Sequence, residues 1–273
     1  MLKLFFPLAA ISAICFHCPG QSTSLLMGAR ANAMGYASSC LADEWSLFGN
    51  VGGLARCEQT AGSFSYDAIP SFKSFNRTSA AFVVPLKFGV IGAGVFRFGD
   101  ELYNEQVASF AFSNTFGLAS LGLKINYIHY HAEGFGNKSA LTLSFGGVAR
   151  LTPKLHVGTY IANLNQPLIS SDGERLPARI SAGLSFLPGE KTIVAAEIEK
   201  DLDHPILFKA GIEYRVNKKF CARTGFNINP NAAFGGFGFK ATRFVLDYAF
   251  QWKEYPGASH QATITYFFKK KKK

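Results

Sequence analysis

The chain has 273 residues, of which 14% are aromatic and 17% charged, and its formal net charge is +10. Five of the positive charges form the terminal run 269–273, and the remaining Lys and Arg are scattered without a basic stripe, which argues against a nucleic-acid-binding protein. Phenylalanine and glycine each occur 27 times. Aromatic residues suit the interface girdles of a membrane barrel, and glycine suits its crowded interior and tight turns.

The first twenty residues have the pattern of a secretory signal peptide. Lys3 supplies a positive charge, and residues 4–16 form an apolar run that is too short to cross a bilayer as a helix. Gly20 is a small residue before Gln21, which we expect to be the first mature residue. A lipoprotein signal at Cys15 is the alternative, although Ile14 is bulky for such a site. The sequence therefore predicts export after cleavage of residues 1–20.

The next segment, residues 21–58, shows no alternation of apolar and polar residues. It is rich in alanine and glycine and carries the acidic pair Asp43 and Glu44, which favours short helices broken by glycine. Cys40 and Cys57 in this segment can either close a short loop by a disulfide or remain small buried thiols. We predict that residues 21–58 form an N-terminal plug.

From residue 59 to 268 nearly every segment alternates between an apolar face and a polar or glycine face. In 246–253 the apolar face carries Leu, Tyr, Phe and Trp, while the other carries Asp, Ala, Gln and Lys. About fourteen such segments of spanning length predict an all-β fold, a closed antiparallel transmembrane β-barrel with the helical plug in its lumen and a lysine tail at 269–273. The expected strands are 60–66, 79–86, 89–98, 105–113, 119–131, 138–150, 155–164, 178–187, 192–200, 206–216, 220–229, 233–240, 242–252 and 261–268.

Charged residues of the plug are expected to face protein or lumen, because a charge that faces lipid is costly. Their candidate partners are the lumen-facing charges of the strands, so we hypothesise a plug–wall ion network; the alternative is that these charges face lumen water. Other inward positions are mostly small or polar, which argues against an apolar channel; the exceptions are Tyr130, Tyr160, Leu187 and Val245. The predicted lumen charges are Lys124, Glu213, Arg215, Arg223, Asp247 and Lys253.

Catalytic and metal-binding patterns are weak. His129 and His131 share one strand face, but no third ligand is evident, and we predict no metal site. Ser259, His260 and Asp247 include the residue types of a hydrolytic triad, but there is no nucleophile-elbow motif. We therefore predict a non-enzymatic protein without a cofactor.

The plug segment contains a motif carried by Gly28, Arg30, Met34, Gly35, Asp43, Glu44, Asn50, Gly53 and Leu54. This motif resembles the plug of FadL-like outer-membrane barrels, most closely the PorV-type branch associated with type IX secretion. The family motif usually has two aspartates where this chain has Asp43 and Glu44, and Pro-Ala where it has Val51 and Gly52. Shorter similarities lie at 177–183, 209–214 and 256–261.

The resemblance implies a fourteen-stranded barrel with an N-terminal hatch in the outer membrane of a bacterium, in contact with its lipid. The branch implies an accessory or docking component of protein secretion, whose partners are secretion-machinery proteins or secreted substrates. The alternative is a FadL-like channel for uptake of hydrophobic small molecules. No nucleic-acid partner is expected.

Overall fold

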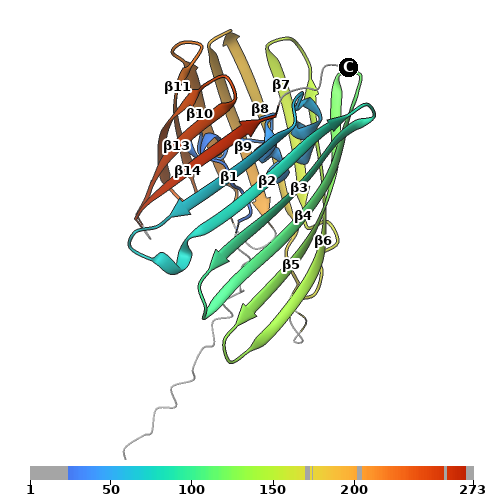
Figure 1. Ribbon diagram of the computed structural model, residues 1–273, viewed down its shortest axis with the longest axis vertical. Helices are drawn as coiled ribbons and strands as arrows, with labels where there is room; N and C mark the ends of the chain where they lie inside the picture. The colour runs from blue at the N-terminus through green and yellow to red at the C-terminus, as the bar shows by residue number, and fades with distance from the viewer. Residues whose placement is uncertain (1–23, 170–172, 174, 202–204, 255–256, 269–273) are drawn as a thin grey trace, which may run out of the picture.

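Fourteen strands close into one antiparallel barrel in the computed structural model, which describes residues 24–169, 173, 175–201, 205–254 and 257–268 (Figure 1). Each strand pairs with its neighbours in sequence, and β1 closes the barrel against β14. This confirms the predicted fold class. The predicted signal peptide 1–20 and lysine tail 269–273 lie outside the described residues. The strands are β1 (Ala61–Ala68), β2 (Arg77–Leu86), β3 (Gly89–Gly99), β4 (Tyr103–Phe116), β5 (Ala119–Ala132), β6 (Gly136–Arg150), β7 (Leu155–Ala162), β8 (Arg179–Gly189), β9 (Thr192–Asp201), β10 (Leu207–Arg215), β11 (Phe220–Ile228), β12 (Ala232–Lys240), β13 (Phe244–Lys253) and β14 (Ala258–Phe267).

The strands form because alternate residues meet two different environments. On β13, Leu246, Phe250 and Trp252 are exposed on the outer face, whereas Asp247 and Gln251 are buried inside. The same alternation recurs around the wall, so the outer surface of the barrel is a band of large apolar side chains. Such an exterior, with polar side chains turned inward, is that of a barrel that spans a membrane.

The two ends of the barrel differ in their connections. Six turns of two to four residues join strands at one end, which we call the turn end; β1 begins and β14 finishes there. Seven connections of three to sixteen residues lie at the other end, the loop end, and one of them contains the short helix η3 (Lys73–Phe75). In outer-membrane barrels the short turns face the periplasm and the longer loops face outward.

The wall is uneven at the loop end, where the long strands β4, β5 and β6 project beyond β7 (Figure 1). Strand β6 pairs with β7 only over Phe145–Arg150. Farther along β6, the Asn165 side chain replaces a strand partner: its Oδ1 accepts from the Leu143 N–H at 2.9 Å and its Nδ2 donates to the Leu141 carbonyl at 2.8 Å.

Residues 24–58 lie inside the barrel as three short helices joined by turns, α1 (Ala29–Ala33), η1 (Glu44–Leu47) and η2 (Val51–Arg56) (Figure 1). Helix α1 packs against β11–β14, η1 against β1–β3, and η2 against β3–β6, so the plug follows the inner wall around its circumference. No helix among the described residues has the length and apolar character needed to cross a membrane.

The inner wall is mostly small or polar, as expected, but one part of it is apolar, which was not expected. Inward side chains of β2–β5, among them Val83, Phe96, Val107 and Ile128, form one apolar cluster with η1 and η2 of the plug, and we call this side the apolar half. On β4 and β5 the cluster alternates with buried polar side chains such as Glu105, Lys124 and Asn126. The inward faces of β8–β14, the polar half, carry mainly buried charged and polar side chains. The sequence pattern of β3 did not reveal its apolar inner face. Its outer face is also apolar, so the pattern does not show which face lines the lumen.

Glycines on the inner wall let the plug backbone approach the strands. Gly211 and Gly225 are partners in the β10–β11 register, and a Cβ atom on either would overlap the main chain of Met34. Met34 is fully buried at this contact. The glycine-rich polar faces of the sequence are thus, at this place, contact surfaces for the plug.

We predict that Gly225→Ala loosens the plug, because its methyl group has no space beside the Met34 backbone. The control is Gly235→Ala on the neighbouring strand β12, where the nearest atom to an added Cβ is 4.0 Å away. Limited proteolysis of the folded barrel should cut residues 24–58 faster in Gly225→Ala only. Equal protection in both variants would contradict this contact.

Candidate functional site

The plug is joined to the polar wall by a buried ion cluster centred on Glu213. Arg30 of α1 binds this carboxylate with two nitrogens, Nε to Oε2 at 2.8 Å and Nη2 to Oε1 at 3.0 Å. Arg223 donates to Glu213 at 2.7 Å and to Asp247 at 2.6 Å. Arg30 also reaches Asp43 at 3.1 Å, which ties two parts of the plug together. The hypothesised network therefore includes one cluster in which Arg30 and Asp43 of the plug meet three charges of the wall, Glu213, Arg223 and Asp247.

Other predicted lumen charges lie outside this cluster. Arg215 is exposed at the turn end, where its Nη1 donates to the Glu190 carbonyl at 3.3 Å. Lys253 is half-buried near the loop end and takes part in no ion pair between described residues. Lys124 is fully buried, donates to the Leu47 carbonyl at 2.9 Å, and lies over the Tyr160 ring.

The remaining motif residues shape the plug itself. Asn50 caps η2 by accepting from the Gly52 N–H, and its Nδ2 donates to the Ser39 carbonyl at 2.6 Å and to the Gly147 carbonyl of β6 at 2.9 Å. Asp43 caps η1. Gly28 and Gly35, on either side of α1, have positive φ angles of 104° and 66°.

Two further motif residues pack in the interior. Gly53 lies against the Leu41 carbonyl, and Leu54 is fully buried in the apolar cluster. Together with the caps, these contacts give each motif position a structural task within the plug.

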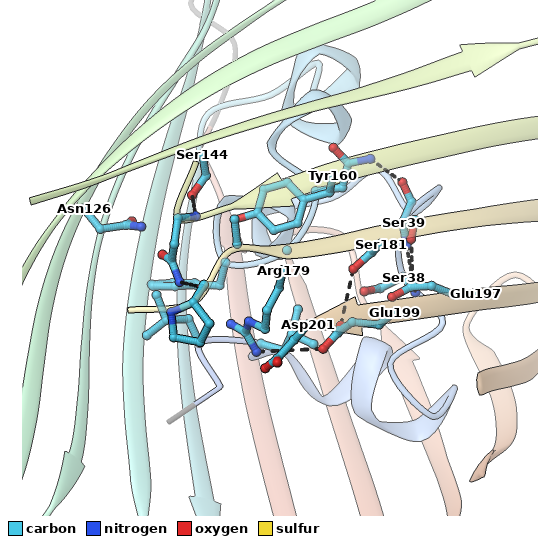
Figure 2. A pocket seen from close by; sticks show the side chains of 18 of the residues that line it. Ser38, Ser39, Asn126, Ser144, Tyr160, Arg179, Ser181, Glu197, Glu199 and Asp201 are labelled. Atoms are coloured by element: carbon cyan, nitrogen blue, oxygen red, sulfur yellow. Dashed lines mark hydrogen bonds and ion pairs between the residues drawn. The ribbon is translucent and has the colours of Figure 1, made fainter. Parts of the chain in front are cut away.

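A second polar anchor, which the sequence analysis missed, is Glu197 on β9 (Figure 2). Its Oε2 accepts from the backbone N–H groups of Ser38 and Ser39 at 2.9 and 2.7 Å, and from the Ser39 hydroxyl. Lys209 on β10 donates to Glu197 at 2.9 Å and to Glu199 at 2.6 Å. The available signal was the inward phase of Glu197 and Lys209 within their strands, which faces both charges toward the lumen.

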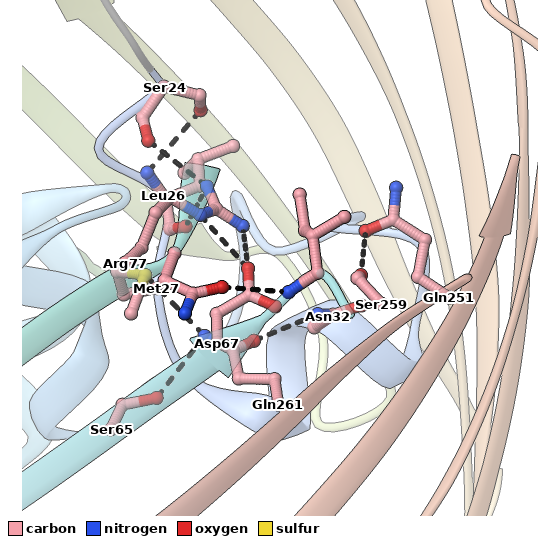
Figure 3. Close-up of polar contacts among 12 residues, drawn as sticks. Ser24, Leu26, Met27, Asn32, Ser65, Asp67, Arg77, Gln251, Ser259 and Gln261 are labelled. Atoms are coloured by element: carbon pink, nitrogen blue, oxygen red, sulfur yellow. Dashed lines mark hydrogen bonds and ion pairs between the residues drawn. The ribbon is translucent and has the colours of Figure 1, made fainter. Parts of the chain in front are cut away.

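A third anchor holds the start of the described chain at the loop end (Figure 3). Arg77 of β2 binds Asp67 of β1, and its guanidinium also donates to the Ser24 carbonyl at 3.2 Å. Beside it, Gln261 of β14 accepts from the Asn32 side chain at 2.9 Å. These contacts join the plug to the seam where β1 meets β14.

Two cavities adjoin the plug. A cavity of about 80 Å³ lies at the loop end, between Leu25, Leu26 and Phe48 of the plug and the inner faces of β5–β9 (Figure 2). A vestibule of about 660 Å³ opens at the turn end and is lined by the ion cluster, with Trp45 among its apolar walls. The plug separates the cavity from the vestibule.

The described residues form neither a metal site nor a disulfide. Among the described residues, no group of three His, Cys, Asp or Glu side chains is placed to hold a metal ion. The three described cysteines, Cys40, Cys57 and Cys221, are free thiols, so Cys40 and Cys57 do not form a disulfide.

Solved structures of similar fold include hydrocarbon channels and a FadL homologue. The toluene transporter TodX of Pseudomonas putida matches with a TM-score of 0.71 and 12% identity, over 88% of this chain and 97% of its own. The monoaromatic hydrocarbon channel CymD matches at 0.68 and 13%, over 91% and 99%. A FadL homologue of Pseudomonas aeruginosa matches at 0.62 and 10%, over 89% and 98%. No protein-family model and no curated protein sequence matches the chain.

At these identities the likeness establishes a shared fold. The matches give no support to the PorV branch or to a secretion role.

We predict that Arg223→Glu releases the plug, because it leaves Glu213 and Asp247 facing a third carboxylate. Removing one partner of a buried ion pair costs about 3–5 kcal/mol. Arg215→Glu is the matched control, since Arg215 has the same inward phase on the neighbouring strand but is exposed. Protease should cut the plug of the Arg223 variant readily and leave that of the Arg215 variant protected. Protection of both would exclude the ion cluster as an anchor.

We also predict that plug docking weakens as pH rises. Glu44 lies on the plug, where burial and the adjacent Asp43 carboxylate raise its pKa to about 7. Between about pH 4.5 and 7 the Glu44 carboxyl group keeps its proton in the docked plug and has lost it in the undocked plug. Docking therefore weakens by at most about tenfold per pH unit over this range. Above pH 7 the carboxyl group is ionised in both states, and docking changes no further.

Proteolysis of the plug measured across this range, with a protease calibrated at each pH, tests the titration. Glu44→Gln should remove the pH dependence, whereas Glu58→Gln, an exposed residue of the same segment, should retain it. A pH profile that Glu44→Gln leaves unchanged would assign the effect to another group.

Proposed function

We propose that this protein is a FadL-like channel of the bacterial outer membrane that passes small hydrophobic molecules. The observation that carries the proposal is the apolar half of the lumen. A water-filled porin has a polar interior, whereas here the inner face of β3 presents Val90, Phe96 and Phe98 along the length of the wall. Gly92 and Gly94, between them, are covered by the apolar plug residues Leu47, Phe48 and Leu54.

The small cavity at the loop end supports the same function. Leu25, Leu26, Phe48, Ile128 and Leu176 give it an apolar side, whereas charged and polar side chains of β8 and β9 line the other. The apolar side offers the contacts that a hydrophobic molecule needs. Its 80 Å³ is less than the roughly 150 Å³ of an engineered cavity that accepts benzene. Entry of an aromatic hydrocarbon therefore requires the plug side chains to shift.

The comparisons support this alternative of the sequence analysis better than its main hypothesis, a PorV-type secretion component. TodX is a toluene transporter and CymD is a monoaromatic hydrocarbon channel. A hydrophobic small molecule is thus the partner we propose, together with outer-membrane lipid around the apolar exterior. A non-enzymatic role agrees with the channels found in the comparisons.

The test is uptake of radiolabelled toluene by cells that express the barrel. Ser144→Trp places a large ring in the cavity, because Ser144 faces inward on β6 and lines it. We expect uptake to fall about tenfold, as filling a binding pocket does. Phe145→Trp, one residue along and facing lipid, is the matched control and should keep the original rate.

Heat-dependent mobility in gels, which distinguishes folded from unfolded barrels, shows whether both variants fold. Unchanged toluene uptake by a folded Ser144→Trp barrel would overturn the proposal. Equally rapid passage of a sugar through the unmodified barrel would also overturn it, because that result indicates an aqueous pore.

A further inference from the structure

The turn end of the barrel carries an excess of positive charge that the loop end lacks. Its six turns, each taken with one flanking residue on either side, contain nine Lys or Arg and one acidic residue, Glu190. The described loop-end connections, taken in the same way, contain five basic and five acidic residues. The nine basic residues, which we call the basic collar, are Lys87, Arg150, Lys154, Lys191, Arg215, Lys218, Lys219, Lys240 and Arg243.

The collar is accessible and its charge is not neutralised within the protein. Eight of the nine side chains are exposed, and Arg243 is half-buried. The ion pairs between described residues include none of them. Their polar contacts are to neutral groups: Arg215 donates to the Glu190 carbonyl and Arg243 to the Tyr266 hydroxyl.

The collar also lies at the edge of the lipid-facing surface. Exposed apolar side chains adjoin it in the same turns: Phe88 is 65% exposed beside Lys87, Leu151 is 56% exposed beside Arg150, and Phe220 follows Lys219. Aromatic and large apolar residues mark the level at which a barrel wall passes from hydrocarbon to headgroups. Arg215, Lys218, Lys219 and Lys240 also line the mouth of the vestibule. The cationic groups of Lys87, Lys154 and Lys191, which do not line it, are therefore the ones placed at headgroup depth.

We propose that the basic collar binds the phosphates of anionic phospholipids in the leaflet that surrounds the turn end. Five of the six turns contribute to it, so the charge is distributed around the circumference. A ring of cations next to an apolar band fits a shell of lipids, whereas a soluble acidic partner would contact one side. Each Lys or Arg near a membrane surface adds to the attraction for anionic lipid, and salt weakens it.

The experiment measures lipid retained by the full barrel after extraction from equimolar phosphatidylglycerol and phosphatidylcholine. We expect phosphatidylglycerol to be enriched about tenfold, and the enrichment to fall between about 0.05 and 0.5 M salt. The triple variant Lys87→Gln, Lys154→Gln and Lys191→Gln, at exposed positions that do not line the vestibule, should lose most of it. The loop-end control Lys73→Gln, Lys138→Gln and Arg175→Gln, also at exposed positions, should keep it.

Equal retention of the two lipids, or equal loss in the collar and control variants, would overturn the proposal. Recovery of an acidic protein in place of enriched lipid would assign the collar to a protein partner and overturn it as well. The result is independent of transport: Ser144→Trp should retain phosphatidylglycerol normally, and the collar variant should take up toluene normally. Failure of one proposal is thus distinguishable from failure of the other.

Discussion

Glu213 is a carboxylate that binds both the plug and the neighbouring wall, and it fixes the arrangement of the polar half of the lumen. The wall places two carboxylates, Glu213 and Asp247, beside one guanidinium, Arg223, so the buried wall cluster is one positive charge short. Arg30 of the plug supplies that charge through a two-nitrogen contact. Buried charges are tolerated when they are paired and hydrogen-bonded. The wall therefore depends on the plug as much as the plug depends on the wall.

The same arrangement is repeated on β9 and β10. Glu197 and Glu199 share the ammonium of Lys209, and the plug completes the group with the backbone N–H groups of Ser38 and Ser39. Backbone donors serve here because glycines of the wall allow close approach of the chain. Ion pairs and hydrogen bonds are directional, so this half of the lumen specifies one position for the plug.

The sequence predicted the barrel well because strand alternation is a local property. An outer apolar face and an inner polar face are visible in 246–253 without any knowledge of its neighbours. The ion cluster around Glu213 could also be predicted, because Glu213 and Arg223 have an inward phase. The anchor at Glu197 and the apolar inner face of β3 were not predicted. The contact of Glu197 with Ser38 and Ser39 depends on which plug residue faces which strand, and the sequence does not show this. On β3 both faces are apolar, so alternation does not identify the face that lines the lumen.

The difference between the two halves decides where passage is feasible. Displacing the plug from the polar half would remove Arg30 from Glu213 and the backbone N–H donors of Ser38 and Ser39 from Glu197. Breaking a buried ion pair in this way costs several kcal/mol. On the apolar half, side chains such as Leu47 and Phe48 make nondirectional contacts with β3. A hydrocarbon can replace those contacts with similar ones, at little net cost in buried apolar area. A plug that stays anchored on β8–β14 can thus let apolar molecules pass along the inner face of β2 and β3, where ions and sugars find few polar partners.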